Sequence, residues 1–355
     1  MYYKEGIIKK ELGTRIWELG DERFCRRPGL LLLIPNPQFL IPLPLTMFVS
    51  MSLSLLPLVK EGDTRAIARA ISVVENEASG YRELLMALPE SETPVIGVTG
   101  PPGAGKSTLV DGLIRELVGS GARVAVLCVD PSSPFNLGAV LGDRIRMSDW
   151  YTHPSVFIRS LATRGSMGGL NPKIIEITEL LKGAPFDYIV VETVGVGQSE
   201  IEIAGLADVT VVVVVPEAGD EVQTMKAGLM EIADIFVVNK GDRPDADTFV
   251  KNLRLMLAPT FHTHSEEVPI IKTVATQHKG LDTLVEKIKE GLTHLYTSEK
   301  KYWLLAERVY QLIQKERMKD MPKERILEAI KRSGSRNVFH LFTLLEGEEE
   351  VRRQA

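Results

Sequence analysis

The chain has 355 residues, of which 44% are hydrophobic and 25% are charged, as in an ordinary globular protein. Its 42 basic and 47 acidic residues give a net charge of −5, which excludes a broadly basic nucleic-acid-binding protein. The two cysteines, Cys25 and Cys128, are too few for a disulfide framework and form no zinc-ligand pattern. We therefore expect a protein of the reducing cytoplasm.

The first fifty residues differ from the rest in composition. No charged residue occurs from Pro28 to Val59, a stretch of 32 residues. Four prolines between positions 35 and 44 interrupt it, and its least broken piece, Leu45 to Leu56, is shorter than the roughly 20 residues of a membrane-spanning helix. We leave residues 1–50 out of the predicted fold. They are a leader created by a translation start placed ahead of Met51, an extension peculiar to this chain, or a targeting segment.

After Met51 the sequence predicts regular structure. Apolar residues recur at helical spacing from Thr64 to Asn76, where Asp63 is placed to cap the helix, and a second short helix is expected over Ser79–Leu88. Runs rich in valine and isoleucine then alternate with helical segments, at Val95–Thr99, Val124–Val129, Tyr188–Glu192, Val209–Val215, Ile235–Val238 and Ile270–Thr273. Strands that are apolar on both faces are typical of a parallel sheet covered by helices. We therefore predict a doubly wound α/β domain with a mostly parallel sheet.

The end of the chain is helical in pattern. Three helices are predicted, over Leu281–Leu295, Ser298–Lys319 and Lys323–Lys331. The middle one has an apolar stripe formed by Tyr302, Leu305, Val309, Leu312 and Ile313. This stripe either packs on the same domain or forms a dimer surface. The predicted organisation is thus N-terminal helices over 51–94, a nucleotide-binding domain over 95–295 and a helical C-terminal arm, a dimerisation element, over 296–355.

The strongest motif begins at Gly100 and reads Gly-Pro-Pro-Gly-Ala-Gly-Lys-Ser-Thr, between a predicted strand and a predicted helix. It matches the phosphate-loop pattern G-x-x-x-x-G-K-[ST], in which backbone N–H groups and a helix N-terminus bind phosphate. Lys106 is expected to reach the β- and γ-phosphates, and Ser107 to offer its hydroxyl to Mg²⁺. The expected nucleotide-binding residues of this loop are Gly100, Gly103, Ala104, Gly105, Lys106, Ser107 and Thr108.

A second motif, Asn239-Lys240-Gly241-Asp242, follows a predicted strand and has the N-K-x-D pattern of a guanine site. The Asp242 carboxylate can accept hydrogen bonds from guanine N1–H and the 2-amino group, two donors that adenine lacks. Lys240 can lie along the base, Asn239 can tie its loop to the phosphate loop, and Ala275 can offer backbone contacts to the guanine oxygen. Together the two motifs predict a protein that binds GTP and GDP.

Acidic residues near the phosphate loop are the candidates for a Mg²⁺ site, because this ion prefers oxygen ligands. Asp130 and Glu192 each follow or end a predicted strand, and Asp143 lies in a loop between them. With Ser107 they form the predicted metal site. Gly195 can present its N–H to the γ-phosphate, and the nearby Gln198 is a candidate to orient the attacking water.

In their order along the chain, these motifs resemble those of the MeaB/ArgK family of P-loop GTPases (MMAA in animals). The resemblance covers about residues 52–332, and the first fifty residues match nothing in the family. Besides the phosphate loop and the guanine motif, it rests on Val-Asp-Pro-Ser-Ser at 129–133, Gly-Asp-Arg-Ile-Arg-Met at 142–147, Glu-Thr-Val-Gly-Val-Gly-Gln-Ser-Glu at 192–200 and Gly-Asp-Glu at 219–221.

The resemblance implies a homodimeric GTPase that acts as a chaperone for an adenosylcobalamin-dependent acyl-CoA mutase of the methylmalonyl-CoA mutase type. Such a chaperone gates cofactor loading and reactivation. The resemblance also implies that the segment from Asp220 to Lys226 relays the nucleotide state to the mutase, and it implies catalytic roles for Lys106, Glu192, Gly195 and Arg146. The cobalamin-binding pattern D-x-H-x-x-G does not occur in the sequence, so cobalamin would be held by the partner.

Three other functions share some of these features. A metallochaperone GTPase for a nickel enzyme would have the same phosphate loop and guanine motif, but should carry a His/Cys cluster that this sequence lacks. A small-molecule kinase would transfer the γ-phosphate to a metabolite instead of water. A non-enzymatic scaffold would use the nucleotide only to hold a dimer together.

Overall fold

The computed structural model contains the whole chain, and the structure describes the following residues: 31–33, 40–42, 52–130, 147–163, 170–195, 199–216, 230, 232–257, 268–296, 300–321, 323–334, 337–343 and 345. The chain divides into two compact units, Met1–Tyr296 and Thr297–Ala355. Each unit is described by itself.

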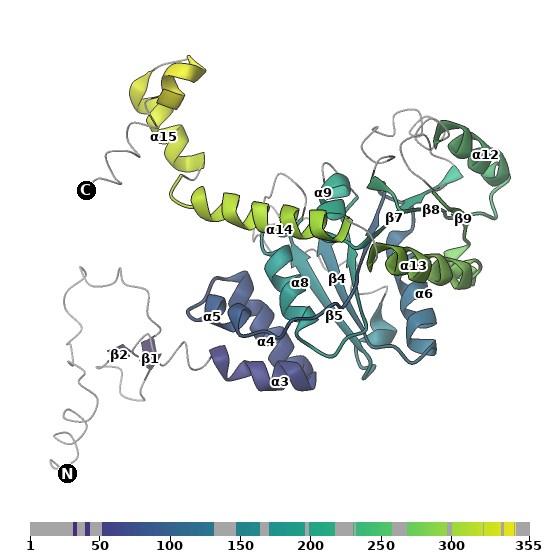
Figure 1. Ribbon diagram of the computed structural model, residues 1–355, viewed down its shortest axis with the longest axis horizontal. Helices are drawn as coiled ribbons and strands as arrows, with labels where there is room; N and C mark the ends of the chain where they lie inside the picture. Colours follow the sequence, from purple (N-terminus) through teal and green to yellow (C-terminus); the bar gives the residue numbers. More distant parts are fainter. Residues whose placement is uncertain are drawn as a thin grey trace, which may run out of the picture. The chain divides into compact units, whose positions relative to one another are not determined.

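The first unit is built on a seven-stranded sheet with the strand order β5-β4-β6-β3-β7-β8-β9 (Figure 1). Every neighbouring pair in this sheet is parallel. The strands are β3 (Val95–Thr99), β4 (Val124–Asp130), β5 (Val156–Ala162), β6 (Tyr188–Glu192), β7 (Val209–Val214), β8 (Ile235–Val238) and β9 (Ile270–Lys272). The predicted α/β class and parallel sheet are confirmed.

Helices cover both faces of the sheet, as the apolar strands require. One core cluster joins the sheet to α6 (Lys106–Gly119) and α13 (Leu281–Tyr296). The other face is covered by the N-terminal helices α4 (Thr64–Glu75) and α5 (Tyr81–Met86), together with α8 (Ile174–Lys182) and α9 (Ser199–Leu206). A third cluster packs α12 (Ala246–Leu257) against β7 and β8.

The seventh strand, β5, was not among the six that the valine- and isoleucine-rich runs predict. It lies at the edge of the sheet, and its central residues include Arg159 and Ser160, which are only half buried. These polar residues interrupt the apolar run by which the other strands are recognised. The structure also places Asp130 inside β4, as its last residue.

The N-terminal helices are part of the core of the first unit. α3 (Leu55–Glu61) precedes α4, and Asp63 caps α4 as predicted, because its Oδ1 accepts a hydrogen bond of 2.7 Å from the backbone N–H of Ala66. α4 buries one face, formed by Ala66, Ile67, Ala70, Ile71 and Val74. In residues 1–50 the structure describes two short antiparallel strands, β1 (Leu31–Leu33) and β2 (Leu40–Pro42).

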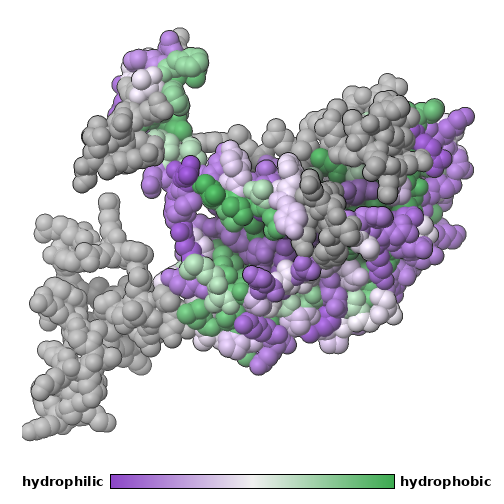
Figure 2. All heavy atoms as spheres, viewed as in Figure 1, coloured by the Kyte–Doolittle hydropathy of each residue, from purple (hydrophilic) through white to green (hydrophobic). Residues whose placement is uncertain are grey.

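The second unit contains α14 (Lys300–Arg317) and α15 (Lys323–Ser333). The apolar stripe predicted on α14 is largely exposed: Tyr302 is 72% exposed, and Leu305, Val309 and Ile313 are 44–52% exposed. Hydrophobic side chains are visible at the surface of these helices in Figure 2.

None of the helices in the described part of the chain is both long and apolar enough to cross a membrane.

Removing the cap of α4 should weaken the whole first unit, because this helix covers one face of the sheet. We expect Asp63→Ala to lower the free energy of unfolding by about 1 kcal/mol, measured by urea denaturation. Asp63→Asn keeps an acceptor for the Ala66 N–H and should cost much less. Equal losses in the two variants would show that the hydrogen bond is not what stabilises the helix start.

Candidate nucleotide-binding site

The phosphate loop joins β3 to α6 at the carboxyl edge of the sheet, where ligands bind in open α/β folds. Gly105 has a φ of +87°, and a side chain there would collide with the amide nitrogen of Asn239. Both the backbone conformation and this close approach therefore require glycine. Ala104, Lys106 and Ser107 are buried, whereas Gly103 is exposed and Thr108 is half buried.

The Lys106 ammonium lies against the backbone of its own loop. Its Nζ donates hydrogen bonds to the carbonyl oxygens of Gly100 (2.9 Å) and Pro101 (3.1 Å). The side chain is 6% exposed, so the charge is satisfied by these buried polar groups. The lysine is thus held beside the backbone that is predicted to surround the phosphates.

Gly195 also approaches this loop. It has a φ of +83°, and a side chain at this position would collide with Lys106 Nζ and with the Gly100 carbonyl oxygen. The loop after β6 therefore passes directly beside the phosphate-loop lysine, as a segment that contacts the γ-phosphate must. Residues 196–198, with Gln198, lie outside the described part of the chain.

Two of the predicted metal ligands are in contact. Ser107 Oγ donates a hydrogen bond of 2.6 Å to Glu192 Oε1, and both side chains are buried. Asp130 ends the neighbouring strand β4 and is 3% exposed. Beside this pair, the hydroxyls of Thr99 and Thr193 are hydrogen-bonded at 2.9 Å and join β3 to the residue after Glu192.

The chemistry of these donors fits Mg²⁺. One hydroxyl and two carboxylates are hard oxygen ligands, and Mg²⁺ commonly takes only a few ligands from protein, with water and phosphate supplying the rest. Within the described residues, no three His, Cys, Asp or Glu side chains gather into a metal cluster, so a closed all-protein site is not formed by them. Asp143 and Arg146 lie outside the described residues.

Asn239 connects the guanine motif to two other loops. Its Nδ2 donates to the Ala104 carbonyl oxygen (2.9 Å), and its Oδ1 accepts from Thr273 Oγ1 (3.1 Å) and from the Ala275 N–H (3.2 Å). The predicted tie between this loop and the phosphate loop is therefore present. The Ala275 N–H is bonded to Asn239, and its contact with guanine stays a prediction.

The other residues of the guanine motif place the Asp242 carboxylate at the surface. Lys240 has a φ of +56°, an uncommon backbone conformation for a non-glycine residue. The N–H of Gly241 donates to the Thr273 carbonyl oxygen at 2.8 Å. Asp242 is exposed, so its carboxylate is accessible to the edge of a base.

A contact that the sequence did not predict holds the chain just after Arg146. Trp150 Nε1 donates a hydrogen bond of 2.7 Å to Asp111 on α6, and the Arg115 guanidinium lies 5.6 Å from the centre of the indole ring. Met147, which lies between Arg146 and Trp150 in the sequence, is fully buried. The chain is thus held to the phosphate-loop helix at Trp150. His153 has a structural role, because its Nδ1 accepts from the Ser155 N–H.

Removing the Asn239 amide should disconnect the phosphate loop from the base-recognition loops. Asn239→Ala leaves buried polar groups at Ala104 and Ala275 without this partner, a cost of about 1–3 kcal/mol for each. We expect GDP to bind roughly 10- to 100-fold more weakly, as measured by calorimetry. The control is Asn76→Ala, at an exposed position after α4, where the amide donates a hydrogen bond to the Ser72 carbonyl oxygen. Equal GDP affinity in the two variants would contradict the proposed role of the Asn239 network.

The comparisons with known proteins agree with this geometry. Residues 67–334 match the family model described as methylmalonyl Co-A mutase-associated GTPase MeaB. A protein of Pyrococcus horikoshii named as a GTPase is 48% identical over 263 residues, which are 73% of this chain and 82% of that protein. The GTPase ArgK of Escherichia coli is 36% identical over 251 residues, which are 68% and 76% of the two chains.

Two further similarities concern proteins with other names. A fused isobutyryl-CoA mutase of Geobacillus kaustophilus is 36% identical over 240 residues, which are 63% of this chain and 22% of that protein. A crystal structure of an LAO/AO transport system kinase has a TM-score of 0.60 and 27% sequence identity, and the similarity covers 85% of this chain and 97% of that one. From its family match, its fold and its close relatives, the chain belongs to the MeaB family and is a P-loop GTPase.

Proposed function

We propose that this GTPase is a chaperone for an adenosylcobalamin-dependent acyl-CoA mutase, and that it gates the loading and reactivation of the mutase cofactor. The observation that carries the proposal is the family match, whose description names methylmalonyl Co-A mutase. The fused isobutyryl-CoA mutase supports it, because a protein named as an acyl-CoA mutase shares 36% identity with this chain. The proposed partner is therefore a mutase of this chemical type.

The nucleotide in this proposal is GTP or GDP, bound at the carboxyl edge of the sheet. The phosphate loop from Gly100 to Thr108 surrounds the phosphates, and Lys106 exchanges its bonds to the Gly100 and Pro101 carbonyls for bonds to phosphate oxygens. Asn239 holds the base-recognition loops, and Lys240, Asp242 and Ala275 contact the guanine. The exposed Asp242 carboxylate supports this assignment.

Mg²⁺ would be held by Ser107, Asp130 and Glu192, and by Asp143, the predicted ligand that lies outside the described residues. When bound, it neutralises charge on the β- and γ-phosphate oxygens. Ser107 and Glu192 are already in contact, and their buried hydrogen bond fixes both side chains. Hydrolysis then depends on positioning and charge: Lys106 stabilises the phosphate oxygens, the Gly195 N–H faces the γ-phosphate, and Arg146 has the catalytic role that the family resemblance implies.

The second unit, which we take as the C-terminal arm over 296–355, is proposed as the dimerisation element. Its stripe of exposed apolar residues on α14 supports this role, since a helix face of this kind is typical of a surface that another chain covers. In the same proposal, residues 51–94 and 95–295 form the helical entry and the GTPase domain. The segment from Asp220 to Lys226, which lies outside the described residues, relays the nucleotide state to the mutase.

Base choice tests the guanine assignment. Replacing the carboxylate by an amide in Asp242→Asn substitutes an N–H donor for one acceptor oxygen, so guanine loses a partner while xanthine, which has an oxygen at position 2, gains one. We expect the preference for GTP over xanthosine triphosphate to fall by at least about tenfold, measured as the ratio of kcat/KM values. An unchanged ratio would remove Asp242 from the base site. Asp245→Asn, three residues further along an exposed loop, is the control.

The partner can be tested with purified components. We expect a purified adenosylcobalamin-dependent isobutyryl-CoA or methylmalonyl-CoA mutase to accelerate GTP hydrolysis by this chain, measured as phosphate release. Lys106→Ala should show no hydrolysis with or without the mutase, because the phosphate-loop charge is lost. No acceleration by either mutase would count against the chaperone proposal. Transfer of label from γ-labelled GTP to a metabolite would favour the kinase alternative instead.

A further inference from the structure

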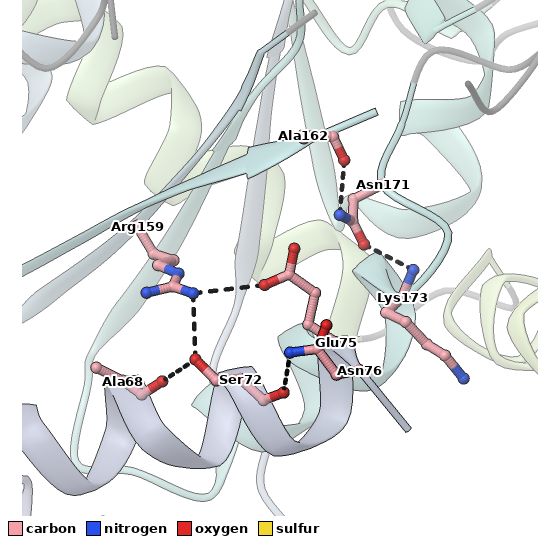
Figure 3. Close-up of polar contacts among 8 residues, drawn as sticks. All are labelled: Ala68, Ser72, Glu75, Asn76, Arg159, Ala162, Asn171 and Lys173. Atoms are coloured by element: carbon pink, nitrogen blue, oxygen red, sulfur yellow. Dashed lines mark hydrogen bonds and ion pairs between the residues drawn. The ribbon is translucent and has the colours of Figure 1, made fainter. Parts of the chain in front are cut away.

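The last turn of α4 makes polar contacts with the core of the GTPase unit (Figure 3). Arg159, on the edge strand β5, donates through Nη2 to Ser72 Oγ (3.3 Å) and pairs with Glu75 (3.4 Å). Ser72 in turn donates to the Ala68 carbonyl oxygen, within α4. The N-terminal helices are therefore attached to the edge strand by polar contacts as well as by their apolar face.

A second attachment lies two residues beyond α4. Lys173, the residue before α8, forms ion pairs with Glu77 (2.5 Å) and Glu176 (3.0 Å), and its ammonium lies 5.0 Å from the centre of the Tyr81 ring. The lysine side chain is only 9% exposed. Burial lowers the pKa of Lys173, but its bonds and charge interactions with the two glutamates outweigh this effect, so the pKa is raised and the side chain stays charged.

The backbone around Glu77 supports a specific role for this ion pair. Glu77 has a φ of +48°, in the left-handed region that non-glycine residues rarely adopt. From this position, two residues after α4, its carboxylate reaches Lys173 across 96 positions of sequence. A residue kept in this conformation is consistent with a contact that has a function beyond ending a helix.

Asn171 connects this attachment to the carboxyl edge of the sheet. The side chain is 2% exposed, its Nδ2 donates to the Ala162 carbonyl oxygen (2.7 Å), and its Oδ1 accepts from the Lys173 N–H (2.8 Å). Figure 3 shows Asn171 between Ala162 and Lys173. One buried amide thus joins the last residue of β5 to Lys173, the residue before α8.

Ala162 is the register partner of Asp130, the last pair between β5 and β4. The N–H of the next residue, Thr163, donates to the Asp130 carbonyl oxygen at 3.1 Å. Asp130 is one of the carboxylates assigned to Mg²⁺. The contacts therefore run without a break from α4, through Glu77, Lys173 and Asn171, to the strand end that carries this carboxylate.

We propose that Lys173 and Asn171 are positioning residues for Asp130, and that the N-terminal helices support Mg²⁺ binding through them. This inference rests on the proposed role of Asp130 in the metal site. Neither residue touches the nucleotide: Glu77 fixes Lys173, Lys173 and its N–H fix Asn171, and Asn171 fixes the backbone beside Asp130. Removing one of these contacts should lower the affinity for the metal more than the affinity for the nucleotide.

The test uses the full chain with Lys173→Met, which removes both ion pairs. We expect the dissociation constant of Mn²⁺ in the GDP complex, measured by electron paramagnetic resonance, to rise at least about fivefold. The Mg²⁺ concentration that gives half-maximal GTP hydrolysis should rise similarly, while KM for GTP at saturating Mg²⁺ stays within about twofold. Lys173→Arg keeps the charge and should restore most of the metal affinity.

The matched control is Lys182→Met at the opposite end of α8. Lys182 is equally buried, and its ion pair with Glu179 at 2.9 Å joins two residues of α8 itself. This variant should lose thermal stability with unchanged Mn²⁺ affinity. If Lys173→Met does not fold, Glu77→Gln takes its place, because this residue is 40% exposed and the change keeps its size.

Each result decides the inference. Wild-type Mn²⁺ affinity in a folded Lys173→Met or Glu77→Gln variant would overturn it and leave the proposed function intact. An equal loss of affinity in Lys182→Met would also overturn it, because general destabilisation would then be the cause. A wild-type chain whose GTP hydrolysis needs no divalent cation would overturn the proposed metal site and, with it, this inference.

Discussion

The hydrogen bond between Ser107 and Glu192 is the interaction on which the site depends. A buried carboxylate is costly unless it is paired or hydrogen-bonded, and Glu192 is 3% exposed. The 2.6 Å bond from Ser107 satisfies one of its oxygens and at the same time fixes the first turn of α6 beside β6. This geometry requires β6 to lie next to β3, and the strand order places it there. The strand order therefore brings the first turn of α6 and the end of β6 together, and the hydrogen bond fixes them there.

Asn239 connects the base-recognition loops by hydrogen bonds, as Ser107 connects α6 to the end of β6. It is 3% exposed and bonds to three groups that come from the phosphate loop and from the segment after β9. These segments lie far apart in sequence, and the Asn239 amide can join them because it has both a donor and an acceptor. The Gly105 backbone must then approach Asn239 without a side chain between them. The phosphate and base sites thus form one connected structure at the carboxyl edge.

The parts of the fold that sequence could predict are those encoded by neighbouring residues. The phosphate loop, the Asn239 motif and the valine-rich strands each occupy a short segment with a fixed spacing, and the structure contains all of them. Strand β5 could not be recognised in this way, because Arg159 and Ser160 interrupt its apolar run. Arg159 is tolerated there only because α4 supplies Ser72 and Glu75 from elsewhere in the chain. The residue pattern of β5 can therefore be understood only together with α4, which packs beside it.

The same reason limits prediction of the site. Trp150 bonds to Asp111 across 39 positions, and Lys173 pairs with Glu77 across 96. Neither pair has a sequence signature, since a tryptophan or a lysine in a polar segment is ordinarily interpreted as a surface residue. Their burial becomes evident only when the helices are in place.

The two faces of the sheet therefore contribute differently to the same edge. α6, on one face, provides Ser107 and the hydrogen-bond partner of Trp150, so it carries residues of the predicted site itself. On the other face, α4 acts through Lys173 and Asn171 on the backbone beside Asp130. The family match begins at residue 67, within α4, so most of this helix lies inside the matched region. A partner protein that contacts α4 or α5 would thus have a physical route to the metal site that does not pass through the nucleotide.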